Sequence, residues 1–528
     1  MHGEGRRQRR PLEIQQRWAG GSSHIARLRA PTSRWSSDIE RTKRPRRFLF
    51  QLQAIADDRT TPTAEKQRKL TILEQDALSV VGQFRFKELS QAFNLYGKIR
   101  LRPGQAMLIE MESQIAARIG DFGSQGISNV IVGYAKIGEM PGKEALSLLE
   151  ARAAAIAGEF NAQNFANTLW AFAKLGIRPG SGSLSLLEER AAAVAEHFKA
   201  QEISNSMWAY AKLGIKPGAG LLRLLEMRAV AVAGRFKAQE FSNTMWAYAT
   251  LELQPDLKLV SVLESKATAI VNEFNPQNVA NALWAYGTLG IEPQSGLLRL
   301  LECRAESLVG DFNPQNIANT LWAFGALGLQ PGTSLIPLME ERAAALAGKF
   351  ETRGIASMLW AYATLDTLPS GNLVLLPLCH VTDGCMDIDS LDDRSIQQLH
   401  MYLLVCQLEL ESKGGRGRLG RHPDLAHVEN LSNRLTKRRQ SVHCATANDQ
   451  NPHHGANVHR RAEMDAVSSS LRRLGFEFEQ DAVDERSGYS IDILIKAAKH
   501  IRSGTCSHET CGVLRKGVAL AVGGPGNL

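Results

Sequence analysis

The chain has 528 residues, of which 44% are hydrophobic and 22% charged, so it is too long for one hydrophobic core and too apolar to be disordered throughout. No stretch approaches the roughly 18–20 continuous apolar residues of a membrane-spanning helix, and we expect a soluble protein. The net charge of +8 lies at the two ends. Residues 1–50 hold 13 Lys and Arg against 4 Asp and Glu, whereas residues 84–349 hold 25 against 24. General attraction to nucleic acid must therefore come from the ends or from local patches.

The N-terminal segment is rich in arginine and serine, with Arg6, Arg7, Arg9 and Arg10 in one cluster. This composition is typical of an organellar transit peptide, although a basic nucleic-acid-binding arm or a nuclear signal has a similar one. We favour targeting, and expect residues 1–60 to be a basic, disordered transit peptide or arm. If this targeting prediction is correct, we expect the protein to be a soluble protein of the mitochondrion or chloroplast.

From Phe84 onward the sequence repeats with a period of 38 residues. Three columns show it: Trp170, Trp208, Trp246, Trp284, Trp322 and Trp360; Pro179, Pro217, Pro255, Pro293, Pro331 and Pro369; and Phe84, Phe122, Phe160, Phe198, Phe236, Phe274, Phe312 and Phe350. Six units are clear, two earlier ones keep the frame, and residues 388–408 resemble a degenerate last unit. Weak terminal units are expected in a solenoid because its outermost faces meet water.

Each repeat is predicted to be a helical hairpin. In one unit, Asn161 caps a first helix that runs to Leu175 and ends at Gly176. A second helix covers residues 183–197, where apolar residues recur at spacings of three and four. One hairpin cannot bury its apolar faces alone, so the units must stack. The sequence therefore predicts an all-α superhelical solenoid over residues 84–410.

Beyond the solenoid, residues 411–457 are rich in Gly, Arg, His, Asn and Ser and are predicted to be a flexible basic linker. Residues 458–528 are predicted to form a small α/β domain, with a helix over 460–474 and short strands over 489–495 and 518–522. The seven cysteines are most simply free thiols, since Cys506, His508 and Cys511 lack a fourth zinc donor at a familiar spacing. We expect no metal and no cofactor.

The first helix of each unit carries a stripe of small and polar residues opposite its apolar face. The Asn167 column changes least, whereas two neighbouring columns vary in hydrogen-bonding character, as a protein that reads one base per hairpin requires. The candidate RNA-binding residues are Asn164, Asn167, Lys174, Glu202, Asn205, Lys212, Glu240, Asn243, Asn278, Asn281, Asn316 and Asn319.

Structural interpretations stand beside these functional ones. The Trp column fits inter-repeat core better than a base-stacking platform, because a large ring at the edge of the apolar face buries much area. The Asn167 column equally fits a structural amide that ties adjacent hairpins together. Glu188 and Arg190, which recur at Glu226 and Arg228, fit an exposed or inter-repeat charge pattern.

The segment FNPQNIANTLWAFGALG (312–328) and its copies resemble the octotricopeptide repeat of algal organellar RNA-binding proteins, which is related to FAST-kinase-like repeats. The tail segments HRRAEMDAVSSSLRRLGFEFEQ, GYSIDILI (488–495) and GVALAVGGPGNL (517–528) look like a RAP domain. The resemblance implies an α-α superhelix that binds organellar transcripts and controls their maturation, stability or translation.

The RAP domain is similar to a restriction-endonuclease-like fold, in which two or more acids would hold a metal ion. Asp492 matches the first acid, whereas Ala521 and Gly523 replace the later ones. One carboxylate cannot position a divalent ion and its water well. We therefore expect a vestigial acid and no enzyme activity.

These observations favour a non-catalytic protein that binds single-stranded organellar mRNA or rRNA, with roughly one nucleotide per complete hairpin and a footprint of roughly 7–9 nucleotides. RNA-processing or ribosomal proteins are further expected partners. Two alternatives stay open: a protein-interaction scaffold, since stacked hairpins also bind peptides, and a ribonuclease that uses the tail.

Overall fold

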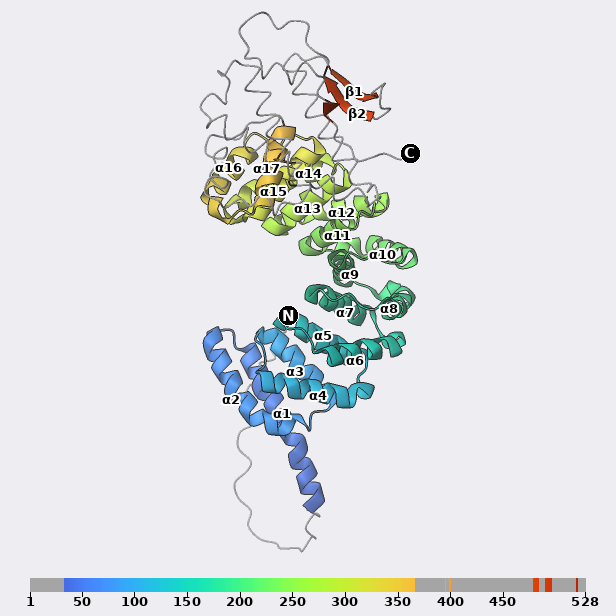
Figure 1. Ribbon diagram of the computed structural model, residues 1–528, viewed down its shortest axis with the longest axis vertical. Helices are drawn as coiled ribbons and strands as arrows, with labels where there is room; N and C mark the ends of the chain where they lie inside the picture. The colour runs from blue at the N-terminus through green and yellow to red at the C-terminus, as the bar shows by residue number, and fades with distance from the viewer. Residues whose placement is uncertain are drawn as a thin grey trace, which may run out of the picture.

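A computed structural model of the chain describes residues 33–365, residues 395, 398 and 399, and the strand residues 478–483, 490–495 and 519–520. Residues 33–365 form seventeen α-helices in a solenoid-like array that bends into an arc (Figure 1). The prediction of a helical solenoid over residues 84–410 is confirmed for residues 84–365. None of the helices in the described part of the chain is long and apolar enough to cross a membrane.

The helices form two layers, because each odd-numbered helix packs on the next odd one and each even-numbered helix on the next even one. Figure 1 shows α5, α7, α9 and α11 on the inner side of the arc and α6, α8 and α10 on its outer side. The inner helices are α1 Ser33–Asp57, α3 Phe86–Ile99, α5 Ser124–Ile137, α7 Ala162–Leu175, α9 Ala200–Leu213, α11 Ala238–Thr250, α13 Pro276–Leu289, α15 Pro314–Leu327 and α17 Thr352–Thr364. The outer helices are α2 Thr63–Val81, α4 Gln105–Arg118, α6 Lys143–Ala155, α8 Ser181–Ala193, α10 Ala219–Val232, α12 Leu257–Ala269, α14 Ser295–Leu308 and α16 Leu335–Ala345.

The helix boundaries follow the predicted caps. The side chain of Asn161 accepts a hydrogen bond from the backbone N–H of Asn164, and Asn275 and Asn313 cap α13 and α15 in the same way ahead of a proline. Glycines end five inner helices in the left-handed conformation; Gly176, for example, has a φ of 70°. A short 3-10 helix after each of seven outer helices leads into the Phe column, whose members are buried.

A glutamate in the outer layer ties each repeat to the next. The Glu188 carboxylate accepts a hydrogen bond from the hydroxyl of Tyr210 in the following inner helix, at 2.6 Å. Its counterparts Glu112 and Glu74 also accept the backbone N–H of Gly142 and Gly104, at 2.8 Å and 2.9 Å. Tyrosine–glutamate bonds of this kind join Tyr96 to Glu74, Tyr134 to Glu112, Tyr210 to Glu188, Tyr248 to Glu226 and Tyr286 to Glu264. Stacking of hairpins is thus fixed by directional bonds as well as by apolar burial.

An arginine in the outer layer makes a second inter-repeat tie. The Nε–H of Arg190 in α8 donates to the backbone carbonyl of Phe160, which follows α6, at 2.8 Å. Arg152, Arg228, Arg304 and Arg342 repeat this bond to the Phe 30 positions earlier. The inter-repeat interpretation of the Glu188 and Arg190 columns is therefore confirmed.

The helical array begins before the 38-residue repeats are recognisable. Helix α1 lies within the segment for which the composition predicted a disordered arm, and its Phe48 packs on Phe84 with ring centroids 5.5 Å apart. The apolar residues Phe48, Leu49 and Leu52 are buried. Their contacts with α2 and α3 outweigh the basic composition that motivated the prediction.

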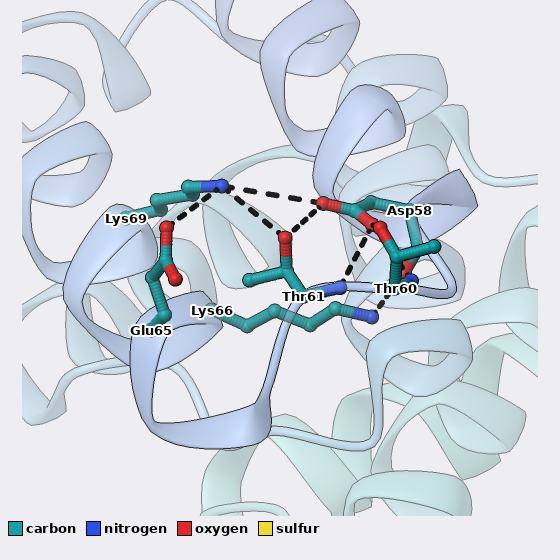
Figure 2. Close-up of polar contacts among 6 residues, drawn as sticks. All are labelled: Asp58, Thr60, Thr61, Glu65, Lys66 and Lys69. Carbon is teal, nitrogen blue, oxygen red and sulfur yellow. Dashed lines mark hydrogen bonds and ion pairs between the residues drawn. The ribbon is translucent and has the colours of Figure 1, made fainter.

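Asp58 organises the turn between α1 and α2 (Figure 2). Its carboxylate accepts bonds from the backbone N–H of Thr60 and Thr61 at 2.9 Å and 3.0 Å, and from both threonine hydroxyls. The ammonium of Lys69 lies between Asp58 and Glu65, 4.0 Å and 3.4 Å from their carboxylate oxygens. The Thr61 hydroxyl, followed by the backbone bonds, holds the pKa of Asp58 well below its usual range. This turn fixes the entry of the chain into α2.

The C-terminal region contributes three described strands, β1 Phe478–Val483, β2 Ser490–Ile495 and β3 Ala519–Leu520. They form an antiparallel sheet in the order β1-β2-β3, in which Ile493 pairs with both Gln480 and Leu520. The strands predicted over 489–495 and 518–522 are present in shortened form. The predicted helix 460–474, linker 411–457, last repeat unit and Cys506, His508 and Cys511 cluster lie outside the described residues, apart from residues 395, 398 and 399 of that unit.

Candidate nucleic-acid interface

Each inner helix leaves one narrow stripe uncovered. In α7 every residue from Ala162 to Lys174 is buried except Gln163, Asn167, Trp170 and Lys174. These four are spaced by four, three and four residues, so they share one face of the helix. Because outer helices cover the opposite side and neighbouring inner helices cover the flanks, this face is the inner surface of the arc (Figure 1).

Successive inner helices repeat the stripe, so four columns run along the inner surface. Gln201, Asn205, Trp208 and Lys212 of α9 occupy the same places, again as its uncovered positions. The glutamine column is Gln125, Gln163, Gln201, Gln239, Gln277 and Gln315, and the asparagine column is Asn129, Asn167, Asn205, Asn243, Asn281 and Asn319. The glutamines are exposed and the asparagines half-buried. Together they form a two-wide track of amides, here called the amide track.

The side chains of the amide track have no hydrogen-bond partner elsewhere in the described part of the chain, whereas other amides do. The side chain of Gln254, for example, donates to the carbonyl of Leu289 at 3.3 Å, and that of Asn278 donates to the hydroxyl of Ser242 at 3.0 Å. A structural role for the Asn167 column would require such bonds between hairpins. None of its six asparagines makes one among the described residues, although Ser357 at the same position of α17 donates to Gln398 at 3.2 Å. The amides are accessible donors and acceptors in a fixed array.

The tryptophans form a ladder beside the amide track. Trp322 and Trp360 are buried at 3% and 1% exposure, while the four earlier ones are half-buried. Ring centroids lie 6.5 Å apart for Trp246–Trp284, 6.2 Å for Trp284–Trp322 and 6.0 Å for Trp322–Trp360. The interpretation of this column as inter-repeat core holds from Trp246 to Trp360, whose rings pack on one another, while Trp170 and Trp208 are partly buried against the core. The half-buried rings also contribute an aromatic edge to the inner surface.

The first variable column, which begins with Asn164, lies in the first turn of the inner helices, where its side chains contact the helix starts. Glu202 and Glu240 accept the backbone N–H of Lys199 and Lys237 at the start of their helices, both at 2.8 Å. Asn278 and Asn316 accept the N–H of Asn275 and Asn313 in reciprocal caps. Asn164, Glu202, Asn278 and Asn316 are also buried. The column is therefore set back from the stripe, and the side chains of Glu202, Glu240, Asn278 and Asn316 serve to cap their own helices.

The second variable column lies at the C-terminal end of the stripe. Lys174 and Lys212 are exposed, and Thr250, Thr288, Ala326 and Thr364 succeed them. The Thr288 hydroxyl is buried without a partner, and that of Thr364 donates to helix carbonyls. The structure thus brings Asn167, Asn205, Asn243, Asn281, Asn319, Lys174 and Lys212 onto one surface.

The glutamine column escaped prediction although its signal was present, since six identical residues recur at the 38-residue spacing. Gln163 and Asn164 are both polar residues of the first turn of α7, and only the structure separates the exposed Gln163 from the buried Asn164. No group of three or more metal-ligating side chains occurs among the described residues. Asp492 lies in β2.

Comparison with known families identifies the solenoid. A model of the RNA-editing substrate-binding complex 6 protein family matches residues 67–295 and again residues 221–368, which together exceed half of the chain. The chain belongs to this family. The RNA-editing substrate-binding complex 6 match covers inner helices from α3 to α17, including the whole amide track. Its two overlapping placements agree with a repeat array, because one model fits the chain in two registers. No curated protein matches the chain.

Proposed function

We propose that the protein binds single-stranded RNA along the inner surface of its solenoid, as a component of an RNA-editing or RNA-processing assembly, and that it has no catalytic activity of its own. The amide track carries this proposal. Twelve side-chain amides in register, none bonded within the described protein, supply the donors and acceptors that base edges require.

The family supports the same function, since its name places it in a substrate-binding complex of RNA editing. The repeat resemblance points in this direction too: octotricopeptide proteins are organellar RNA-binding proteins, and a RAP domain commonly follows such repeats. We infer a mitochondrial or chloroplast transcript as the ligand, and RNA-processing proteins as partners. Residues 458–528 resemble a RAP domain, but of the acids expected in that fold only Asp492 is present. For this reason we propose no catalytic activity.

The test is a binding titration of the full-length protein with a pool of labelled single-stranded RNA. The triple variant Asn167→Ala, Asn205→Ala and Asn243→Ala removes three consecutive amides. At about 1 kcal/mol for each lost hydrogen bond, we expect affinity to fall about 100-fold. The control variant Ser185→Ala, Ser261→Ala and Thr268→Ala removes three exposed polar groups of the outer helices and is expected to bind as the wild type does. Equal affinity of the triple variant and the control would refute the role of the amide track.

A protein-interaction scaffold is the second candidate function, and one observation favours it. Three outer helices carry an exposed leucine at the same repeat position: Leu186 at 44%, Leu224 at 37% and Leu300 at 36% exposure, with the half-buried Val262 between the last two. Such a row on the outer surface suits contact with another protein. Loss of a bound protein on Leu186→Ser and Leu224→Ser, with RNA affinity unchanged, would assign this surface to assembly.

A further inference from the structure

The charge of the solenoid is balanced overall, but the lysines on its inner helices are confined to one half of its length. The last turns of α3, α5, α7 and α9 each carry a lysine: Lys98, Lys136, Lys174 and Lys212. The corresponding turns of α11, α13, α15 and α17 carry no basic residue. These four lysines, here called the lysine strip, occur on consecutive inner helices in the blue-to-teal half of the arc (Figure 1).

The lysine strip lies on the same face as the amide track. Asn167 and Lys174 are seven residues apart, which is two helical turns or about 10 Å along the helix axis. All four lysines are exposed. A single extended ligand on the inner surface would therefore meet ammonium groups from α3 to α9, together with amides from α5 onward. Beyond α9 it would meet amides up to α15 and the half-buried edges of Trp246 and Trp284, without ammonium groups.

The lysines have no counter-charge within the described residues. No carboxylate lies within 4.0 Å of any of the four ammonium groups, whereas the nearby Arg102 pairs with Glu139 at 2.9 Å. Lys136 lies across the preceding helix: a methyl group at Gly97 would be 3.2 Å from its Cβ and 3.3 Å from its Cδ. The glycine thus lets the stem of Lys136 lie close beside Lys98. Although Lys136 is exposed, its stem packs against Gly97, and this partial burial, then the charges of Lys98 and Arg100, lowers its pKa.

The helix dipole does not account for the strip. A cation in the last turn stabilises any helix, so the same residue would be expected on all eight inner helices from α3 to α17. The strip instead stops after α9, where Thr250 takes the position of the lysine. A row of like charges that repel each other and lack counter-ions is matched by a polyanion.

We propose that the solenoid holds single-stranded RNA asymmetrically, with the lysine strip contacting consecutive backbone phosphates in the N-terminal repeats and the C-terminal repeats contacting only bases and sugars. This inference rests on the proposed RNA binding and deepens it. An acidic peptide is the other polyanion that such a strip would fit, and the experiment separates the two.

The experiment measures RNA affinity of the full-length protein at several salt concentrations. Each lysine–phosphate contact contributes about 0.7 to the slope of log affinity against log salt for single strands. The variant with Lys98, Lys136, Lys174 and Lys212 all changed to Gln should lose about 3 from this slope. The control changes Arg223, Arg235, Lys258 and Arg299 to Gln; these are exposed cations of the outer layer, and the slope should stay as in the wild type.

Neutral methylphosphonate linkages placed in turn along the RNA locate the contact. We expect affinity to fall only when they occupy one end of the bound segment, and to be insensitive to them in the lysine variant. Equal slopes in the lysine variant and the wild type, or a uniform effect of the neutral linkages, would overturn the asymmetry.

Two further outcomes separate the lysine strip from the amide track. A reduced salt slope in the lysine variant, together with wild-type affinity of the Asn167, Asn205 and Asn243 variant, would support phosphate binding by the lysine strip. It would refute RNA binding by the amide track. Wild-type protein that binds polyglutamate through the lysines, but no RNA, would refute both proposals.

Discussion

Removal of a single hydroxyl, in Tyr210→Phe, tests the tie between consecutive repeats. The Tyr210 side chain is fully buried in α9 and its hydroxyl donates to Oε1 of Glu188 in α8, at 2.6 Å. The substitution leaves ring packing intact and takes one donor from the carboxylate. Any change in unfolding free energy therefore reports the hydrogen bond and not a cavity.

The magnitude follows from the surroundings of the glutamate. A hydrogen bond to a charged group contributes about 1.5–3 kcal/mol to stability. Glu188 is half-buried, so water replaces part of the lost interaction, and we expect the low end, about 1.5 kcal/mol. The chain supplies its own reverse experiment, because Phe172 and Phe324 stand at the tyrosine position. Phe172→Tyr should stabilise by about 1 kcal/mol, since its hydroxyl would meet Glu150.

Denaturant unfolding, monitored by far-UV circular dichroism, measures both variants. We expect the midpoint to fall for Tyr210→Phe and to rise for Phe172→Tyr, with the slope unchanged because the buried area is unchanged. Midpoints that coincide with the wild type in both variants would show that the tyrosine–glutamate bonds do not contribute to stacking.

Three further predictions concern pH, a strained turn and the tail. Burial raises the pKa of Tyr96, Tyr134, Tyr210, Tyr248, Tyr286 and Tyr362 above 10, so the folded protein keeps protons that the unfolded chain releases. Their stabilising contribution is complete below about pH 10 and should fall above it by up to about 1.4 kcal/mol per pH unit for each tyrosine; an unfolding free energy that is constant from pH 9 to 11 would contradict this. Glu252 has a φ of 51° where five other repeats have glycine, so Glu252→Gly should stabilise by about 1 kcal/mol in thermal unfolding, and a lower melting temperature would argue against backbone strain. Incubation of the full chain with single-stranded RNA and Mg²⁺ or Mn²⁺ should yield no cleavage; cleavage abolished by Asp492→Ala would establish a ribonuclease instead.

The repeat and its hairpins were predictable because they depend on local rules. A period of 38 residues, asparagine caps and glycine stops are visible in single columns, and Asn161 and Gly176 occupy the predicted ends of α7. The point at which the helical array begins could not be predicted from the sequence, because α1 has a basic composition. Its place in the array depends on the burial of Phe48 against Phe84.

The site was half predictable for a similar reason. Helical periodicity separates a polar side from an apolar one, which placed Asn167 and Lys174 correctly on one surface. It cannot resolve neighbours within the polar side. The predicted Asn164 is buried and offers its backbone N–H to the cap residue Asn161, whereas Gln163, which was not predicted, is an exposed member of the amide track.

The period, the caps and the apolar spacing act within one repeat, and they suffice to make this protein a stack of helical hairpins. Which polar side chains are engaged and which are available depends on the tertiary structure. That distinction depends on contacts between repeats. Tyr210 donates a hydrogen bond to Glu188 and Arg190 donates one to the carbonyl of Phe160, whereas the amides have no partner among the described residues. The same contacts set the lysine strip on one continuous surface, which no single repeat contains.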